Sequence, residues 1–239
     1  MEIFVAGQDL KSVKRFFLGK HVFYYKLLNP FPETNFLSGI DSGFFALNIA
    51  MNYRSNKFRD PMGTLNMQAG VFGPISPIQR QMAPQGGMIL GVGSSDDFWT
   101  PDQLRDAAKG GSYLKSEVVQ GINFDNIKDL VKNDHVALLA FDVDTHGNPG
   151  TYGGVNAHWA VVVGYGIFHD GSKYLITTHS WGGFYIWSME KLIQSNTQLL
   201  NLPQVGQTQA LINGPVLSNP PAASLSLNVV RDKMVVVAA

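Results

Sequence analysis

The chain has 239 residues, of which 45% are hydrophobic, 11% aromatic and only 15% charged, and its 18 basic residues balance its 18 acidic ones. This composition excludes a disordered chain and gives no basic surface for nucleic acid or an anionic membrane. Because the chain has no cysteine, it has no disulfide framework and no thiolate metal site. No apolar run reaches the roughly 18 residues that span a bilayer, and we expect one soluble domain over residues 1–239.

A buried helix is the first element that the sequence predicts. Asp41 and Ser42 both suit its N-cap. From there to position 54 apolar residues occupy nearly every side, which is typical of a helix buried all round. Residues 60–95 are rich in Gly, Pro and Met and predict an irregular segment.

Helices and then strands follow. Thr100-Pro101 predicts an N-cap and first helical position, with a helix to about Lys109. Further helices are predicted over residues 124–133 and 189–195, and strands over 135–143, 158–165, 174–178, 183–187 and, once or twice, 225–237. A helical half over about 1–133 and a β-rich half over about 134–239 is the α+β pattern, with an antiparallel sheet.

Three polar residues far apart in the sequence are candidates for one nucleophilic site. Ser42 begins the buried helix, where unpaired N–H groups and the helix dipole stabilise an anion. His158 begins the second predicted strand and His179 follows the third. A nucleophile, a base and a group that orients the base are the parts of covalent acyl transfer. Taken singly, each has a structural explanation: a capping residue, a core-edge histidine and a turn residue.

The hairpin between the two histidine-bearing strands decides whether the histidines meet. A turn centred near Phe168 and His169 places them opposite each other on one side of the sheet. A turn centred on Asp170-Gly171 shifts the register by four residues. The sequence leaves both registers open.

Several segments resemble a known family. Residues 156–164 (Asn-Ala-His-Trp-Ala-Val-Val-Val-Gly) and 179–182 (His-Ser-Trp-Gly) resemble the histidine and Asn-Ser-Trp-Gly segments of papain-like cysteine peptidases. The resemblance is stronger to the actin maturation protease family, whose members carry a Ser-Cys-Gly helix start and an Ala-His-Trp-Ala-Val strand. Residues 39–47 look like that helix start, with Ser42 in the place of the cysteine. The resemblance continues through residues 135–144, 185–187 and 194–199.

The resemblance implies a papain-like α+β fold, in which a helical half carries the nucleophile and an antiparallel sheet carries the base across a cleft. It implies hydrolysis of a peptide bond near the N-terminus of immature actin. Carried over to this chain, Ser42 takes the nucleophile position and His158 the base position. His179 stands where papain-like enzymes have Asn.

The remaining site residues follow from the same comparison. Gly43 and the backbone N–H of residue 42 are expected to hold the oxyanion at the helix start. Asn35 is the amide nearest to the place of the family's oxyanion donor, although its spacing differs. Trp159 and Trp181 are expected beside the substrate, with Trp181 shielding the two histidines from water.

Serine at position 42 is the main departure from the family pattern. A thiol is partly ionised near neutral pH and is strongly nucleophilic, whereas a serine hydroxyl needs far more help from its base. We therefore expect this form to be an inactive cysteine peptidase. A cysteine-free chain with serine here has the features of a deliberately inactivated variant, and a natural pseudoenzyme is the alternative.

Other interpretations stay open. Asp142, Asp144 and His146, with His158 nearby, are candidate Mn or Zn ligands, but a solvated acidic loop explains them as well and we expect no metal. The same fold supports transamidation, deamidation or acyl transfer. A non-catalytic module that binds a chain terminus in the cleft is the third alternative.

The expected partners follow from this assignment. We expect a protein or peptide substrate, with actin as the candidate, and no cofactor, nucleic acid or membrane. We expect a monomer in the cytoplasm, with delivery into a host cytosol as an alternative.

Overall fold

The computed structural model describes residues 3–5, 22–28, 42–43, 45–47, 49–50, 53, 100–112, 115–154, 156–179, 183–199 and 230–238. The elements in chain order are β1 (Ile3–Val5), β2 (Val22–Leu27), α4 (Pro101–Ser112), β3 (Ser116–Gln120), α5 (Phe124–Lys132), β4 (Val136–Val143), β5 (Pro149–Gly150), β6 (Ala157–Phe168), β7 (Lys173–Thr178), β8 (Phe184–Ser188), α6 (Met189–Thr197) and β9 (Lys233–Val237). Residues 42–43, 45–47, 49–50 and 53 are also helical, and we call them the residue-42 helix.

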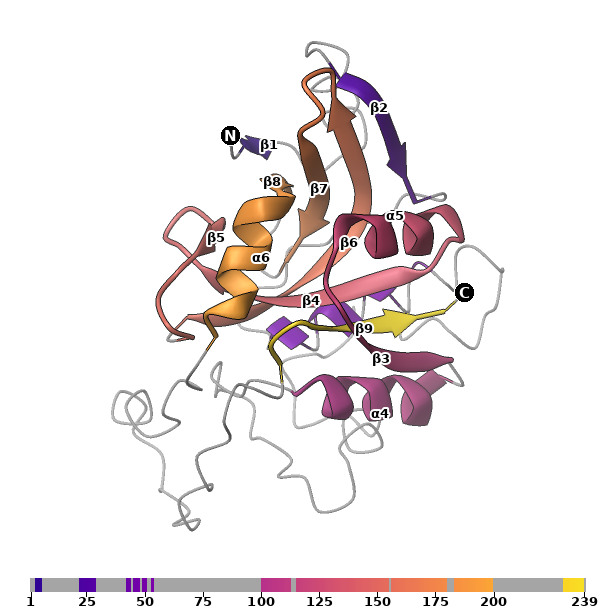
Figure 1. Ribbon diagram of the computed structural model, residues 1–239. Coiled ribbons are helices and arrows are strands. Elements are labelled where there is room, and N and C mark those ends of the chain that lie inside the picture. Colours follow the sequence, from indigo (N-terminus) through magenta and orange to yellow (C-terminus); the bar gives the residue numbers. More distant parts are fainter. Residues whose placement is uncertain are drawn as a thin grey trace.

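The strands form one antiparallel sheet (Figure 1). Its order is β1-β8-β7-β6-β4-β9-β3, with β2 paired to β6 and β5 paired to β4. All eight residues of β4 are buried, because this strand is covered on both faces, and its sequence is accordingly apolar except for Asp142. The sheet places β4 and β6 side by side, so residues from both strands contribute to one surface.

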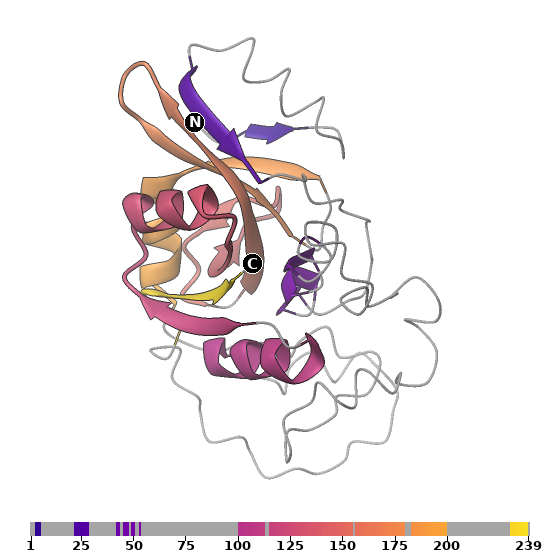
Figure 2. The same cartoon turned by 90° about the vertical axis from the view of Figure 1, so that its right-hand side faces the viewer.

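Helices cover both sides of this sheet. Figures 1 and 2 show α5 and α6 on one side and the residue-42 helix on the other, while α4 lies along β3 and β9. The described residues of the residue-42 helix from Gly43 to Tyr53 are buried. The remaining positions of this helix lie outside the described residues, so burial on every side stays a prediction. Among the described helices, none combines the length and the apolar character needed to cross a membrane.

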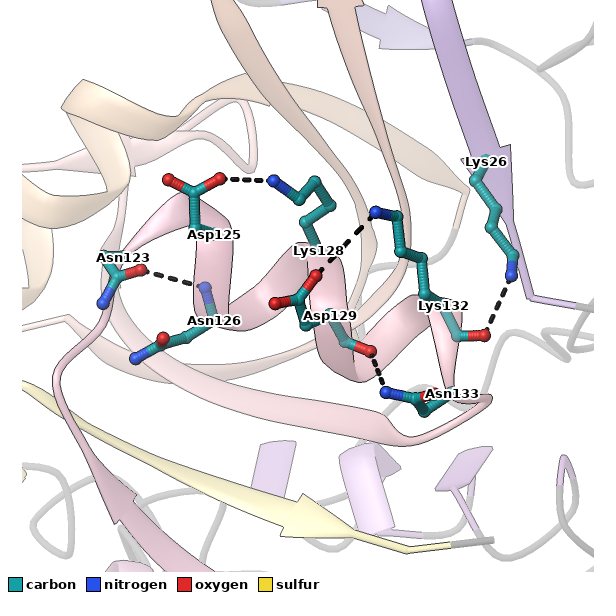
Figure 3. A network of polar contacts seen from close by, with 8 residues as sticks. All are labelled: Lys26, Asn123, Asp125, Asn126, Lys128, Asp129, Lys132 and Asn133. Atoms are coloured by element: carbon teal, nitrogen blue, oxygen red, sulfur yellow. Dashed lines mark hydrogen bonds and ion pairs between the residues drawn. The ribbon is translucent and has the colours of Figure 1, made fainter.

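Helix α5 shows how local sequence fixes an element (Figure 3). The Asn123 side chain accepts a hydrogen bond from the Asn126 N–H at 2.9 Å and so caps the helix N-terminus. At the other end, Asn133 Nδ2 donates to the Asp129 carbonyl at 2.9 Å. The buried stripe consists of Phe124, Ile127 and Val131.

Side chains of α6 take the place of a strand along part of β4. On the side away from β6, β4 pairs with β9 over residues 136–139 and with β5 over residues 142–143. Ser195 Oγ accepts a hydrogen bond from the Asp142 N–H at 2.9 Å, and Asn196 Nδ2 donates to the Ala140 carbonyl at 2.9 Å. The Ala140 carbonyl lies between the stretches paired with β9 and β5, and Asp142 is paired with Gly150. Side chains of α6 thus complete the hydrogen bonding of buried β4 backbone groups at the gap between these strands and at its edge.

The α+β class is confirmed, and most predicted elements are present with shifted ends. Helix α4 continues to Ser112, and β6 extends from Ala157 to Phe168. The expected division at about residue 133 needs correction, because β1, β2 and β3 belong to the half expected to be helical and join the same sheet. The irregular segment predicted over 60–95 lies outside the described residues, and a single domain over 1–239 stays a prediction.

Substituting Asn123 tests the local account of α5. Asn123→Ala removes the oxygen that caps the helix, so we expect the free energy of unfolding to fall by about 1 kcal/mol in urea denaturation. Asn123→Asp is the matched control, because it keeps an acceptor oxygen and should retain most of the stability. Equal unfolding midpoints for the alanine and aspartate variants would contradict the capping role.

Candidate functional site

The residue-42 helix meets the sheet at its first described residue. Ser42 Oγ accepts a hydrogen bond from the backbone N–H of Trp159, with 3.2 Å between oxygen and nitrogen. Trp159 directly follows His158 on β6. Because β7 pairs with β6 only as far as Val161 and Thr178, the helix start occupies the place beside Trp159 that a longer β7 would take. The structure thus brings a hydroxyl from the first part of the chain to the residue next to the predicted base.

The two histidines meet, but through a register different from the direct pairing considered from the sequence. The turn occupies residues 169–172, and Val161 lies opposite Thr178. Continued by one residue, this register places His179 beside Ala160, a diagonal neighbour of His158 on the same face. The two imidazole rings are 5.2 Å apart between centroids and perpendicular.

A β-bulge explains this register. The pairing of β6 with β7 shifts by one residue between Val162 and Gly164. Near the turn the pairing fits a centre close to Asp170, nearer to the Asp170-Gly171 alternative, and the bulge changes the offset before the strands reach the histidines. Gly164 within this β-branched run is the sequence signal that could have indicated a bulge. The sequence analysis did not use it, and glycine alone does not give the direction of the shift.

An aromatic box surrounds the histidine pair, formed by Phe141, Tyr185 and Trp187. The His179 ring stacks on Tyr185 with 4.3 Å between centroids and on Trp187 with 5.9 Å. Phe141 lies edge-on to both histidines, at 5.8 Å from His158 and 5.6 Å from His179. These contacts exclude water from the His179 ring, whereas the His158 ring packs against Phe141 and stays partly exposed. The sequence analysis did not assign the three rings to the site, although residues 185–187 belong to the segments that carry the resemblance.

The β4–β5 turn fixes the tautomer of His179. His179 Nε2 lies 3.0 Å from the Gly147 carbonyl oxygen. A carbonyl only accepts hydrogen bonds, so Nε2 carries the proton in the neutral ring and Nδ1 is the acceptor. Gly147 has a φ of 84°, and a Cβ there would lie 2.6 Å from the Tyr185 ring. This turn therefore requires glycine so that its carbonyl can reach the histidine.

Burial makes both imidazoles weak bases. His158 is half-buried and His179 is fully buried. Desolvation lowers the pKa of His158 from 6.5 to about 4. For His179 desolvation and then the charge of His158 lower the pKa to about 3, opposed by the bond to Gly147. Both rings are consequently neutral at neutral pH.

Of the other predicted site residues, the structure describes Gly43 and Trp159. Gly43 is buried next to Ser42 at the helix start. The Trp159 side chain is fully buried, with 0% exposure, so it is a core residue without surface for a substrate, and its contribution to the site is its backbone N–H. Asn35 and Trp181 lie outside the described residues.

The acidic segment considered as a metal site has other hydrogen-bond partners. The Asp142 carboxylate accepts bonds from three backbone N–H groups and from one side-chain amide. Asp144 Oδ1 accepts from the N–H groups of His146 and Asn148 within the β4–β5 turn. Within the described part of the chain, no three acidic or imidazole side chains are grouped as metal ligands.

Similarity to known proteins falls on the part of the chain that carries His158. Residues 100–166 match the family model "Actin maturation protease-like, C-terminal domain". The actin maturation protease of Drosophila melanogaster is 30% identical over 79 residues, which is 33% of this chain and 30% of that protein. The alignment therefore spans less than a third of the length of this relative.

The matches confirm the resemblance to actin maturation proteases over this segment. The residues that the family model matches run from Thr100, directly before α4, to Gly166, near the end of β6. They include Asp142 and His158 and do not include Ser42 or His179. The structure places Ser42 beside Trp159 and His179 beside His158, so both lie next to the matched segment.

The lowered pKa values predict a pH-dependent stability. Because the unfolded chain binds protons near pH 6.5 and the folded chain only near 4 and 3, the contribution of the neutral histidines is complete above about pH 6.5. It is lost as the pH falls from there through the folded values, by a few kcal/mol in total. Urea denaturation at a series of pH values measures this loss.

Replacing one histidine isolates its contribution to the loss of stability at low pH. His179→Asn should lose less stability than the unsubstituted protein between pH 7 and pH 4, because one buried titrating group is absent. His169→Asn, in the exposed β6–β7 turn, is the matched control. A slope that His179→Asn leaves unchanged would show that burial of this ring does not govern the acid response.

Proposed function

We propose that this protein has a papain-like cysteine-peptidase site in which Ser42 occupies the nucleophile position, and that it acts on the N-terminal region of a protein substrate. The observation that carries the proposal is the contact between Ser42 Oγ and the Trp159 N–H, next to His158. The similarity of residues 100–166 to actin maturation protease-like proteins supports the peptidase class.

In the form with cysteine at position 42, the reaction would begin with transfer of the thiol proton to His158. The thiolate attacks the scissile carbonyl carbon, and the electron pair of the C=O bond moves to the oxygen. The backbone N–H groups at the start of the residue-42 helix stabilise this oxyanion. His158 then gives its proton to the leaving amine, and water hydrolyses the acyl-enzyme with His158 as base.

Serine at position 42 makes the first step unfavourable. A base whose pKa is about 4 withdraws a proton from an aliphatic hydroxyl far less effectively than a base with a pKa near the working pH. A thiol is a much stronger acid than a hydroxyl, and the negative charge of its thiolate raises the pKa of a neighbouring imidazole. We therefore propose that the present form is inactive because its nucleophile does not match its base.

His179 takes the role of orienting residue in this proposal. Its ring lies 5.2 Å from that of His158 between centroids, and its tautomer, set by Gly147, presents an acceptor nitrogen. A neutral acceptor can hold an imidazole in one orientation, as the Asn of papain-like enzymes does. It stabilises the imidazolium less than a carboxylate, because it carries no negative charge.

The name of the relative suggests the substrate. Actin maturation protease acts in actin maturation by its name, and we propose an actin N-terminal segment as the substrate of this chain. A substrate of this kind implies action in a cytosol, that of the producing cell or of a host cell. We propose that the protein works as a monomer and without a cofactor.

The identity of Ser42 favours one second candidate. A protein that keeps the paired histidines but has serine as its nucleophile can hold a peptide without cleaving it. In that case the protein is a non-catalytic module that binds a chain terminus, and it has no acyl-enzyme step.

Ser42→Cys distinguishes the two candidates. We expect this variant to cleave an actin N-terminal peptide at least ~10³-fold faster than the serine form, because it restores the thiol that the base can ionise. Mass spectrometry of the products separates cleavage from deamidation or amine addition.

Two variants serve as controls for this experiment. Ser42→Ala gives the background, and His158→Gln in the Ser42→Cys protein should return the rate to that background. If Ser42→Cys is no faster than Ser42→Ala while the peptide still binds, the peptidase proposal is wrong and the binding module is favoured.

A further inference from the structure

The buried carboxylate of Asp142 lies on the strand next to the predicted base. Asp142 is the β4 partner of Ala157, and its neighbour Phe141 is the partner of His158. The residue has 0% exposure, and a buried carboxylate is costly unless several donors surround it. The donors of its hydrogen bonds therefore identify the segment that the Asp142 carboxylate holds in place.

All backbone donors to Asp142 come from the segment that leads into β6. Oδ1 accepts from the Asn156 N–H at 2.9 Å, and Oδ2 accepts from the N–H groups of Tyr152 at 2.9 Å and Gly154 at 2.8 Å. Gly153 and Gly154 have φ values of 72° and 93°, which glycine adopts without strain. These conformations let backbone N–H groups of one short loop converge on one carboxylate.

Gln198, the C-cap of α6, holds both the carboxylate and the loop. Its Nε2 donates to Asp142 Oδ2 at 2.8 Å and to the Ser195 carbonyl at 2.9 Å. Its Oε1 accepts a hydrogen bond from the Gly153 N–H. One side-chain amide therefore joins the end of α6 to the centre of the loop and to β4.

The same loop also fixes the start of β6, which carries His158 and Trp159. The Asn156 carbonyl accepts from the Val143 N–H at 3.0 Å, and Ala157 and His158 follow at once in register with β4. The next N–H, that of Trp159, binds Ser42 Oγ. A shift of residues 152–156 would thus move the backbone that carries both the base and the contact to the nucleophile position.

We propose that Asp142 and Gln198 are positioning residues, which fix the entry of β6 and so hold the His158 imidazole beside residue 42. This inference rests on the proposed function for the role of His158 as base. Neither residue touches the reacting atoms, and they act through the backbone of residues 152–158.

Two glutamines on the same helix provide a matched test. Gln198→Met keeps side-chain volume and removes all three hydrogen bonds of the amide. Gln194→Met is the control, because Gln194 is exposed and, among the described residues, its amide donates to Glu190 alone, at 3.4 Å. The Ser42 protein, labelled at its histidines, is titrated by NMR from pH 3 to 8, with His158 assigned from the loss of its signal in His158→Gln.

We expect Gln198→Met to raise the titration midpoint of His158 by about one pH unit, because a loosened loop admits water to the ring. Gln194→Met should leave the midpoint unchanged, and His179 is followed in the same spectra as the neighbouring titrating group. A His158 midpoint equal in the two variants, even with a lower melting temperature for Gln198→Met, would overturn the proposal in favour of a purely structural network. If Gln198→Met does not fold, Gln198→Asn, which shortens the amide by one methylene, is judged by the same midpoint.

Turnover adds a readout that separates this inference from the proposed function. In the Ser42→Cys protein, Gln198→Met should lower kcat between about 10-fold and 100-fold with little change in KM. If Ser42→Cys itself shows no turnover, the peptidase proposal fails, while the His158 titration still decides whether Gln198 positions the ring.

Discussion

The hydrogen bond from the Trp159 N–H to Ser42 Oγ joins the two parts of the site. It attaches the start of the residue-42 helix to β6, where β7 has ended. Because the described residues of this helix after Ser42 are buried, it cannot turn or slide without disturbing the core. The position of residue 42 relative to His158 is therefore set by packing on one side and by strand register on the other.

The reactivity of residue 42 and His158 depends on how far water is excluded from the place where they meet. Phe141, Tyr185 and Trp187 pack against His179, and Phe141 also packs against His158. The desolvation that lowers the pKa of both rings strengthens any charge interaction formed there. A thiolate next to His158 would gain from this environment, because the pair neutralises itself. A serine hydroxyl gains little, since it stays uncharged. Identical geometry thus has opposite consequences for the two nucleophiles.

The sequence predicted the elements and residues that a local pattern specifies. It did not predict the features that depend on contacts between distant parts of the chain. The apolar runs of β4 and β6, the start of α4 and the presence of α5 were readable, and so were Ser42, His158 and His179 as a set. Strand β3 was not, because its half-exposed residues form a strand only against β9, far along the chain. The histidine register depended on a bulge between Val162 and Gly164, and the polar network of Asp142 and Gln198 depended on the meeting of α6 with a loop.

In this account the side chain at position 42 interacts directly with the His158 imidazole. The reactivity of a thiol placed at position 42 measures that interaction most directly. The alkylation rate of Ser42→Cys by iodoacetamide is followed against pH, with and without His158→Gln. We predict that the thiol stays reactive well below the ordinary cysteine pKa of about 8.5 when His158 is present and loses this reactivity when it is replaced. Identical pH profiles for the two proteins would contradict the account.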